Sequence, residues 1–234
     1  MSEIAPQFLA GLLPDLPRWV EVRSMLLAGR ATTLGVSTTG SPSFVALEPD
    51  GSLAVVVGQP PDDAILAAAS RSRELLVTPE GAEWIADALP GWRREAATLH
   101  LLGSDARLTP EIPETVRELD PEELVAVPEP ALREELLAAS EEGTRITGAF
   151  HGAAPVAFCY AGSVTERWWD ISIDTLETHR RQGYAARCVA LCIRRMARLG
   201  KQPVWAAVES NVASSGLAAK LDFRPADTLF LFSR

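Results

Sequence analysis

The C-terminal part of the chain has the clearest pattern of apolar and polar positions. Between residues 183 and 199 apolar or small side chains recur every three or four residues, at positions 185, 188, 189, 192, 193, 196 and 199. This spacing predicts a helix with one buried face and with arginines on the other face. The neighbouring apolar runs predict strands at 144–152, 154–162, 167–175, 203–208 and 228–234, and a second helix at 211–221.

The first part of the chain also contains both predicted strands and predicted helices. Residues 32–39 and 43–58 read as strands, and Pro49-Asp50-Gly51 is a turn signal between two apolar runs. Residues 60–70 and 79–89 read as helices that begin with proline or acidic residues. The predicted fold class is therefore α/β (α+β): a C-terminal mixed sheet flanked by helices, after a smaller α/β domain.

Residues 104–130 differ from both flanking regions. They contain five prolines from Pro110 onward and most of the acidic run that spans residues 110–142. Such a composition is typical of a connector. We therefore predict an N-terminal domain at 1–108, an acidic Pro-rich connector at 109–130 and a C-terminal domain at 131–234.

The charge is unevenly distributed. The formal net charge is −9, and residues 110–142 hold 11 acidic against 2 basic side chains, whereas residues 167–201 hold 8 basic against 3 acidic. One basic region in an acidic protein argues against a nucleic-acid partner and favours a small anionic ligand. The acidic run itself is more typical of a solvated linker than of a substrate-attracting surface.

Membrane insertion, export and metal binding are not indicated by the sequence. No apolar run is long enough to span a bilayer, and the start of the chain lacks the basic residues of a signal peptide. The three cysteines and three histidines show no metal-ligand spacing. We expect no metal and a cytoplasmic protein.

The segment Arg180-Arg181-Gln182-Gly183-Tyr184-Ala185 joins a predicted strand to the predicted helix. Helix N-termini carry unpaired N–H groups and a partial positive charge, and glycine lets a ligand approach the backbone. With the two arginines, this turn has the properties of a phosphate or pyrophosphate site. The alternative is a plain turn glycine beside solvated arginines.

This segment resembles the acyl-coenzyme A loop of the GNAT superfamily of N-acetyltransferases, whose pattern is Arg or Gln, two variable residues, Gly, a variable residue, and Gly or Ala. A second family signature follows the next predicted strand as "ESNVASSGLAAKLDF", residues 209–223. Two signatures with a strand between them are more specific than either alone. Within the superfamily, the sequence is most similar to the branch that includes zwittermicin acetyltransferase.

The resemblance implies an acetyl-CoA-dependent enzyme that transfers the acetyl group directly to the primary amine of a small molecule. The pantetheine arm of the coenzyme would lie between strands 168–175 and 203–208, on the backbone of Ile173 and Thr175. The pyrophosphate would lie on the loop. The implied coenzyme-binding residues are Ile173, Thr175, Arg180, Arg181, Gln182, Gly183, Tyr184, Ala185, Asn211 and Ser214.

Catalytic roles are less well marked. The resemblance favours Glu209 as general base, with Asp170 and Asp174 as alternatives, although Glu209 could simply flank the last helix and Asn211 could be its N-cap. The tyrosine that many family members use as general acid is replaced by Ala218, so Ser214, Ser215 or water would protonate the thiolate, or the thiolate would leave unaided. Asp170 and Trp169 are candidate acceptor contacts.

Position 222 is a second departure from the family pattern. Asp222 stands where the family has glycine, which we interpret as a structural variation because Asp tolerates a left-handed backbone.

Instead of an enzyme for small amines, the chain could be a non-catalytic acyl-CoA-binding regulator or an acetyltransferase for protein lysines or N-termini. The N-terminal domain, interpreted as a degenerate GNAT-like half, could form one wall of the acceptor site. A homodimer is left open.

Overall fold

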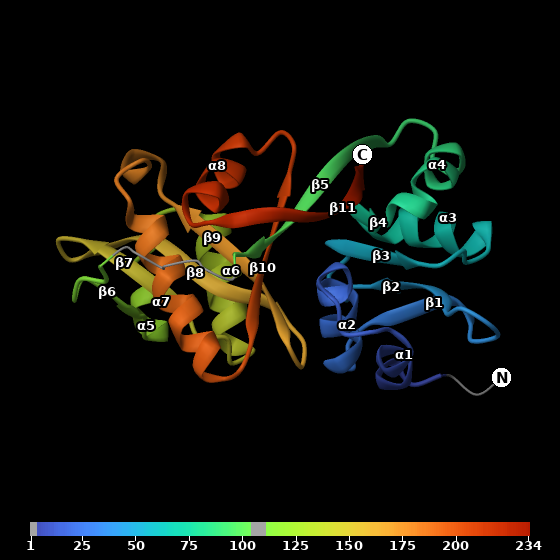
Figure 1. Cartoon of the computed structure of the whole chain (residues 1–234), viewed down its shortest axis with the longest axis horizontal. Coiled ribbons are helices and arrows are strands. Elements are labelled where there is room, and N and C mark those ends of the chain that lie inside the picture. Colours follow the sequence, from blue (N-terminus) through green and yellow to red (C-terminus); the bar gives the residue numbers. More distant parts are fainter. Residues whose placement is uncertain (1–3, 104–110) are drawn as a thin grey trace.

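A computed structural model describes residues 4–103 and 111–234. Their strands form one mixed sheet in the order β1-β2-β3-β4-β11-β5-β10-β9-β8-β7-β6 (Figure 1). The strands are β1 (Thr32–Ser37), β2 (Ser43–Leu47), β3 (Leu53–Val57), β4 (Glu74–Val77), β5 (Arg93–Leu102), β6 (Val116–Glu118), β7 (Thr147–His151), β8 (Ala154–Val164), β9 (Trp168–Thr175), β10 (Gln202–Val208) and β11 (Phe223–Ser233). The mixed α/β class predicted from the sequence is confirmed.

Helices cover both faces of the sheet (Figure 1). They are α1 (Pro6–Leu12), α2 (Val20–Leu27), α3 (Asp62–Arg71), α4 (Pro79–Ala88), α5 (Pro121–Leu124), α6 (Pro130–Glu141), α7 (Tyr184–Arg198) and α8 (Val212–Lys220), with short 3-10 turns at Pro17–Trp19 and Glu177–His179.

In the C-terminal half, α7 and α8 pack on one face of the sheet and α5 and α6 on the other. Cys188 and Cys192 of α7 lie in one core cluster with Trp169 and Trp205. A separate cluster joins α5 and α6 to β8 through a group of fully or largely buried side chains, Leu124, Leu136, Val156, Phe158 and Tyr160. This two-sided burial explains why β8 reads as a near-continuous apolar run rather than as an alternating one.

The N-terminal half is layered in the same way. The α3 and α4 helices pack on one face of β2–β4, whereas α1 and α2 pack on the opposite face. Its element order, two helices, three strands, a helix, a strand, a helix and a strand, is the order of the C-terminal half from α5 to β11. The chain therefore repeats one arrangement of elements without repeating its sequence.

The sheet is continuous across the boundary predicted from the sequence. The last strand, β11, pairs with β4 at one end and with β5 along its length, and β5 also pairs with β10. Each half therefore contributes its final strand to the other half. The predicted bounds 1–108, 109–130 and 131–234 remain a prediction about domains, but hydrogen bonds join the two outer regions (Figure 1).

The predicted connector contains regular structure. Within its described part, β6 pairs with β7, and α5 begins with a capping box at Asp120 and Glu123. Val116, Leu124 and Val127 are buried. Residues 104–110, the first part of the proline-rich stretch, lie outside the described residues.

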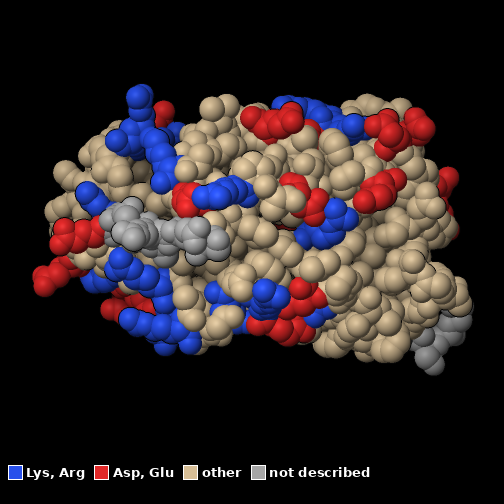
Figure 2. All heavy atoms as spheres, in the orientation of Figure 1, with Lys and Arg blue, Asp and Glu red and all other residues tan. Residues whose placement is uncertain are grey.

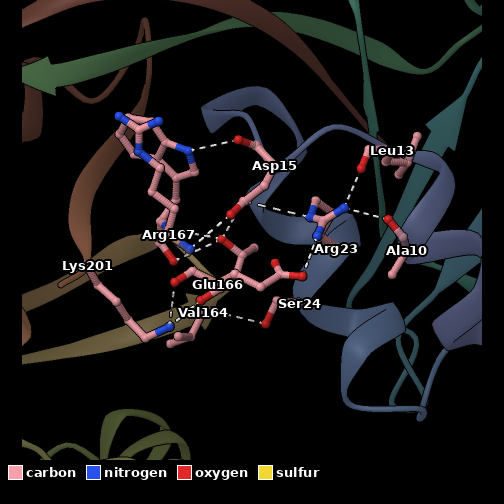
Figure 3. Close-up of polar contacts among 11 residues, drawn as sticks. Ala10, Leu13, Asp15, Arg23, Ser24, Val164, Glu166, Arg167 and Lys201 are labelled. Carbon is pink, nitrogen blue, oxygen red and sulfur yellow. Dashed lines mark hydrogen bonds and ion pairs between the residues drawn. The ribbon is translucent and has the colours of Figure 1, made fainter. Parts of the chain in front are cut away.

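A network of polar contacts ties α2 and the segment before it to the turn between β8 and β9 (Figure 3). Arg23 is almost fully buried; it donates to Glu166 at 2.6 Å and to the carbonyl oxygens of Ala10 and Leu13. Asp15 accepts from the backbone N–H of Arg167 at 2.9 Å. The Glu166 side chain is more than half exposed, but a buried guanidinium is costly to leave without partners, so these contacts fix α2 against the C-terminal half.

Candidate acyl-CoA site

The strands β9 and β10 diverge after a short paired segment. They pair in parallel only from Trp168 to Asp170 on β9 and from Gln202 to Val204 on β10. Beyond that point β9 stays paired with β8, and β10 with β5. The backbone groups of 171–175 that face β10 are thus left without a ladder partner from that strand. Such a fork can accept an extended amide chain as an additional strand.

Helix α7 begins beside the open end of the fork. Gly183 is its N-cap, with a left-handed backbone (φ 84°), and no side chain caps the first turn. A Cβ added to Gly183 would meet no atom within 4 Å, so the space above it is open. Arg181 is also left-handed (φ 64°), a strained conformation for an arginine.

A cleft of about 1030 Å³ connects the fork to this helix end. Its volume is at the upper limit of typical small-molecule sites. Basic side chains and the histidine of the preceding turn line one part of it, namely His179, Arg180, Arg181 and Lys220. Lysine and arginine side chains project in Figure 2 at the upper left, where Figure 1 draws the turn before α7. A diphosphate would meet both the helix end and these cations.

The other wall of the cleft comes from the start of α8. Asn211 caps that helix by accepting from the backbone N–H of Ser214 at 3.0 Å, and both residues line the cleft. The Ser214 hydroxyl oxygen accepts from the Trp205 indole N–H at 2.8 Å, which leaves its own proton free to donate. Ala218, at the position of the family's tyrosine, is fully buried in the core.

Asp170 lies where the fork closes, on the face of β9 opposite α7. Its Oδ1 atom is buried and has no hydrogen-bond partner among the described residues. Burial raises the pKa of the Asp170 carboxyl well above its usual range, and the nearby Glu21 carboxylate raises it further, against hydrogen bonding to the backbone of Ala206 and Ile171. A carboxyl with a raised pKa is a stronger proton acceptor than an ordinary exposed carboxylate.

Asp174 lies four residues further along the same face of β9 and lines the cleft. Burial raises the pKa of its carboxyl, and the acidic side chains of Glu135 and Glu129 act in the same direction. The face of the sheet opposite α7 is therefore acidic, whereas the coenzyme loop on the α7 side is basic.

The structure brings most of the candidate coenzyme-binding residues together. Those that line the cleft are Ile173, Thr175, Arg180, Arg181, Gly183, Tyr184, Ala185, Asn211 and Ser214. Gln182 does not line it; its side chain donates to the carbonyl oxygen of Thr178 at 3.3 Å.

Four other candidates do not line the cleft: Asp170, described above, and Glu209, Ser215 and Trp169. Glu209 is exposed at the end of β10, where its backbone N–H bonds to Ala96, and Ser215 lies in the first turn of α8 without lining the cleft. The expectation that Trp169 contacts the acceptor is not met, because its side chain is fully buried in the core under α7. Its neighbour Trp168 points to the opposite face and is also buried.

The N-terminal half has the same element order but no equivalent site. Its strands β3 and β4 pair at four positions from Leu53↔Glu74 to Val56↔Val77, which uses every residue of β4. Its helix α3 begins with Asp62 and Asp63 in the first turn, and these carboxylates would repel a phosphate. The closed strand pair and the acidic helix start both argue against a second coenzyme site.

Comparisons with known proteins decide the family. The GNAT acetyltransferase family model matches residues 147–231, which include the fork, the loop and the start of α8. Residues 147–231 are a GNAT acetyltransferase domain. The GNAT assignment made from the two signatures is thus confirmed, whereas the placement in the zwittermicin acetyltransferase-like branch stays a prediction.

Solved structures extend the GNAT likeness over nearly the whole chain. A GCN5-related N-acetyltransferase-like protein from Streptococcus suis has a TM-score of 0.72 at 19% identity and covers 96% of this chain and 95% of its own. A GNAT acetyltransferase from Colwellia psychrerythraea has a TM-score of 0.63 at 13% identity, with 100% and 97% covered. At these identities the likeness shows the fold alone.

A third structure is a tandem GNAT protein from the clavulanic acid biosynthesis pathway. Its TM-score is 0.59 at 16% identity, and the match covers 90% of this chain and 86% of that one. A search of curated sequences found no match.

The described residues contain no group of three or more His, Cys, Asp and Glu side chains that could hold a metal ion. They also contain no helix with the length and apolar character that crossing a bilayer requires.

Proposed function

We propose that the chain is an acetyl-CoA-dependent N-acetyltransferase that transfers the acetyl group directly to a primary amine of a small molecule. The observation that carries this proposal is the β9–β10 fork opening onto the uncapped, glycine-led start of α7. Acetyl-CoA needs both features, because its pantetheine arm carries amides and its diphosphate carries negative charge. The three buried, free cysteines fit a reducing compartment, and we place the protein in the cytoplasm.

The residues of the fork would do most of the catalytic work by positioning. The backbone of Ile173 and Thr175 would pair with the pantetheine arm and place the thioester beside Asp170. A backbone N–H of β9 would then stabilise the oxyanion that forms when the amine attacks. Holding amine and thioester in reacting geometry replaces a bimolecular encounter, which is worth about 7–11 kcal/mol in favourable cases.

We assign the proton transfers to two side chains. Asp170 would take the proton from the acceptor ammonium, because it is buried at the fork and has an unpartnered oxygen. Ser214 would donate a hydrogen bond to the departing thiolate and relay a proton to it from solvent, because Ser214 lines the cleft and its hydroxyl accepts from Trp205, which leaves its own proton free. These assignments replace Glu209, which is exposed beyond the end of β10, and Ser215, which does not line the cleft; Asp170 does not line it either but lies where the fork closes.

We interpret the N-terminal half as a GNAT-like half that has lost its coenzyme site. Its repeated element order supports this origin, and its closed strand pair and acidic helix start explain the loss. The tandem architecture of one structural neighbour is consistent with it.

One observation favours a second function, a non-catalytic acyl-CoA-binding module. Ala218 replaces the family's tyrosine and is buried, so no phenol can act as general acid at that position. Steady-state thiol release from acetyl-CoA with a panel of primary amines separates the two functions. The enzyme proposal expects turnover that Asp170→Asn lowers about 100-fold or more, in the range of general base catalysis. Tight acetyl-CoA binding without turnover of any amine would favour the binding module instead.

A further inference from the structure

Helix α2 of the N-terminal half lies over the closed end of the β9–β10 fork. Val20 packs in one cluster with Trp168 of β9, Val204 of β10 and Leu99 of β5. Trp168 and Asp170 share a face of β9, so this packing places the next residue of α2, Glu21, beside the Asp170 carboxyl. The Glu21 carboxylate raises the pKa of Asp170.

The contacts of these two carboxyls leave them without a cation. Glu21 Oε2 accepts a hydrogen bond from the Ser163 hydroxyl at 2.6 Å, and Asp170 Oδ1 has no partner. Among the ion pairs of the described residues, none involves Glu21 or Asp170. A buried polar atom without a partner is costly, so the unpartnered Oδ1 of Asp170 points to a ligand that supplies a hydrogen-bond donor there.

The helix turn that carries Glu21 is held in place by contacts of the two residues Arg23 and Ser24. Two residues further along α2, Arg23 is clamped by Glu166 and by two carbonyl oxygens (Figure 3). One residue after that, the Ser24 hydroxyl accepts from the backbone N–H of Val164 at 3.0 Å. A side chain on a helix held in this way can recognise a ligand without a large ordering cost.

A second acidic pair lies along the same face of the sheet. Asp174 is four residues from Asp170, or about 13 Å along an extended strand. On the neighbouring strand, the Tyr160 hydroxyl donates to Glu135 of α6, and the Glu135 carboxylate raises the pKa of Asp174. Two separated acidic positions on one face fit a ligand with a positive charge at each end.

We propose that Glu21 and Asp170 together form the ammonium pocket of the acceptor site, and that the acceptor is a linear diamine whose second ammonium group lies toward Asp174 and Glu135. This inference rests on the proposed function and adds its substrate class. An amino acid of the same length is a poor ligand, because its carboxylate would face one of the two acidic positions. Glu21 is thus a specificity residue supplied by the half that lacks a coenzyme site.

The test measures binding rather than turnover. The protein, with free CoA present, is titrated calorimetrically with 1,8-diaminooctane and with 8-aminooctanoate, which differ only in the group at one end. We expect the diamine to bind at least 10-fold more tightly. Glu21→Gln keeps the shape of the side chain and should weaken diamine binding about 10-fold, with the CoA affinity unchanged.

Glu83→Gln is the matched control. Glu83 is an exposed acidic residue on α4 of the N-terminal half, where it pairs with Arg94. It should bind both amines like the wild type. The inference is overturned if the wild type does not bind the diamine, if both amines bind equally, or if Glu21→Gln binds the diamine as the wild type does. A CoA titration of the same samples tests the proposed function separately, since loss of CoA binding would contradict that proposal alone.

Discussion

Replacing Gly183 by alanine tests the coenzyme loop most sharply, because the chain contains a matched control at the other end of the same helix. Gly183 precedes α7 with φ 84°, and Gly200 follows it with φ 73°. An added Cβ meets no atom within 4 Å at either position. Alanine at either site therefore pays the left-handed backbone penalty, about 1–2 kcal/mol, and nothing for clashes.

The two variants should be equally destabilised but should differ in ligand binding. For a chain of this size the penalty lowers Tm by about 2–8 °C. At Gly183 the Cβ and any backbone relaxation fall where the diphosphate would approach the N–H groups. We expect Gly183→Ala to weaken acetyl-CoA binding at least 10-fold, or about 1.4 kcal/mol, and Gly200→Ala to keep the wild-type affinity. Equal affinities of the two variants, measured by calorimetry, would refute the assignment of the loop.

Three other changes have outcomes that follow from the structure. The raised pKa values of Asp170 and Glu21 mean that wild-type stability is lost as pH rises from the unfolded carboxyl pKa near 4 toward the folded values. Asp170→Asn should therefore gain in Tm relative to the wild type as pH rises from about 4 to 8, and a constant difference across this range would contradict the burial argument. Ser214→Ala should lower turnover with little change in acetyl-CoA affinity; an unchanged rate would assign thiolate protonation to water. Arg23→Met removes the arginine donor from the Leu13 and Ala10 carbonyl oxygens, although Ala10 still accepts from the Leu13 N–H and Glu166 is more than half exposed, so urea unfolding should show a loss of about 1–3 kcal/mol; an unchanged midpoint would show that α2 is held by apolar packing alone.

Much of the C-terminal half could be predicted from local sequence patterns. The period of the apolar positions marked α7 to within a residue at each end, and Asn211 was named as an N-cap from its residue type. Asp222 has φ 62°, which confirms the left-handed backbone predicted for a residue that replaces glycine. These features depend on residues close together in the chain, which is why periodicity and capping rules reveal them.

The features that the sequence did not reveal depend on contacts between distant residues. The pairing of β11 with β4 joins residues more than 150 positions apart, and no periodicity records a strand's partner. Glu21 lies between apolar residues in "VEVRSMLL", where a single charge reads as a solvated helix position. The sequence feature that could have distinguished it is that both of its neighbours, Val20 and Val22, are apolar. In the structure both are buried, because this helix has little exposed face.

Strand parity explains the error at Trp169. Adjacent side chains of a strand point to opposite faces, so a strand with one open face would bury only one of two neighbouring tryptophans. Because helices cover both faces of β9, both are buried, Trp169 under α7 and Trp168 under α2. The acceptor face that we propose instead consists of the polar residues of β9 that alternate with Trp169 and Ile171.

The central claim is that the chain holds one acyl-CoA site, in the fork of its C-terminal half. Calorimetric titration of the wild-type protein with acetyl-CoA tests it most directly, since one experiment gives both affinity and stoichiometry. The account predicts binding in the micromolar range with one acetyl-CoA per chain. Absence of binding would contradict the fork as a coenzyme site, and two sites per chain would contradict the closure of the β3–β4 pair.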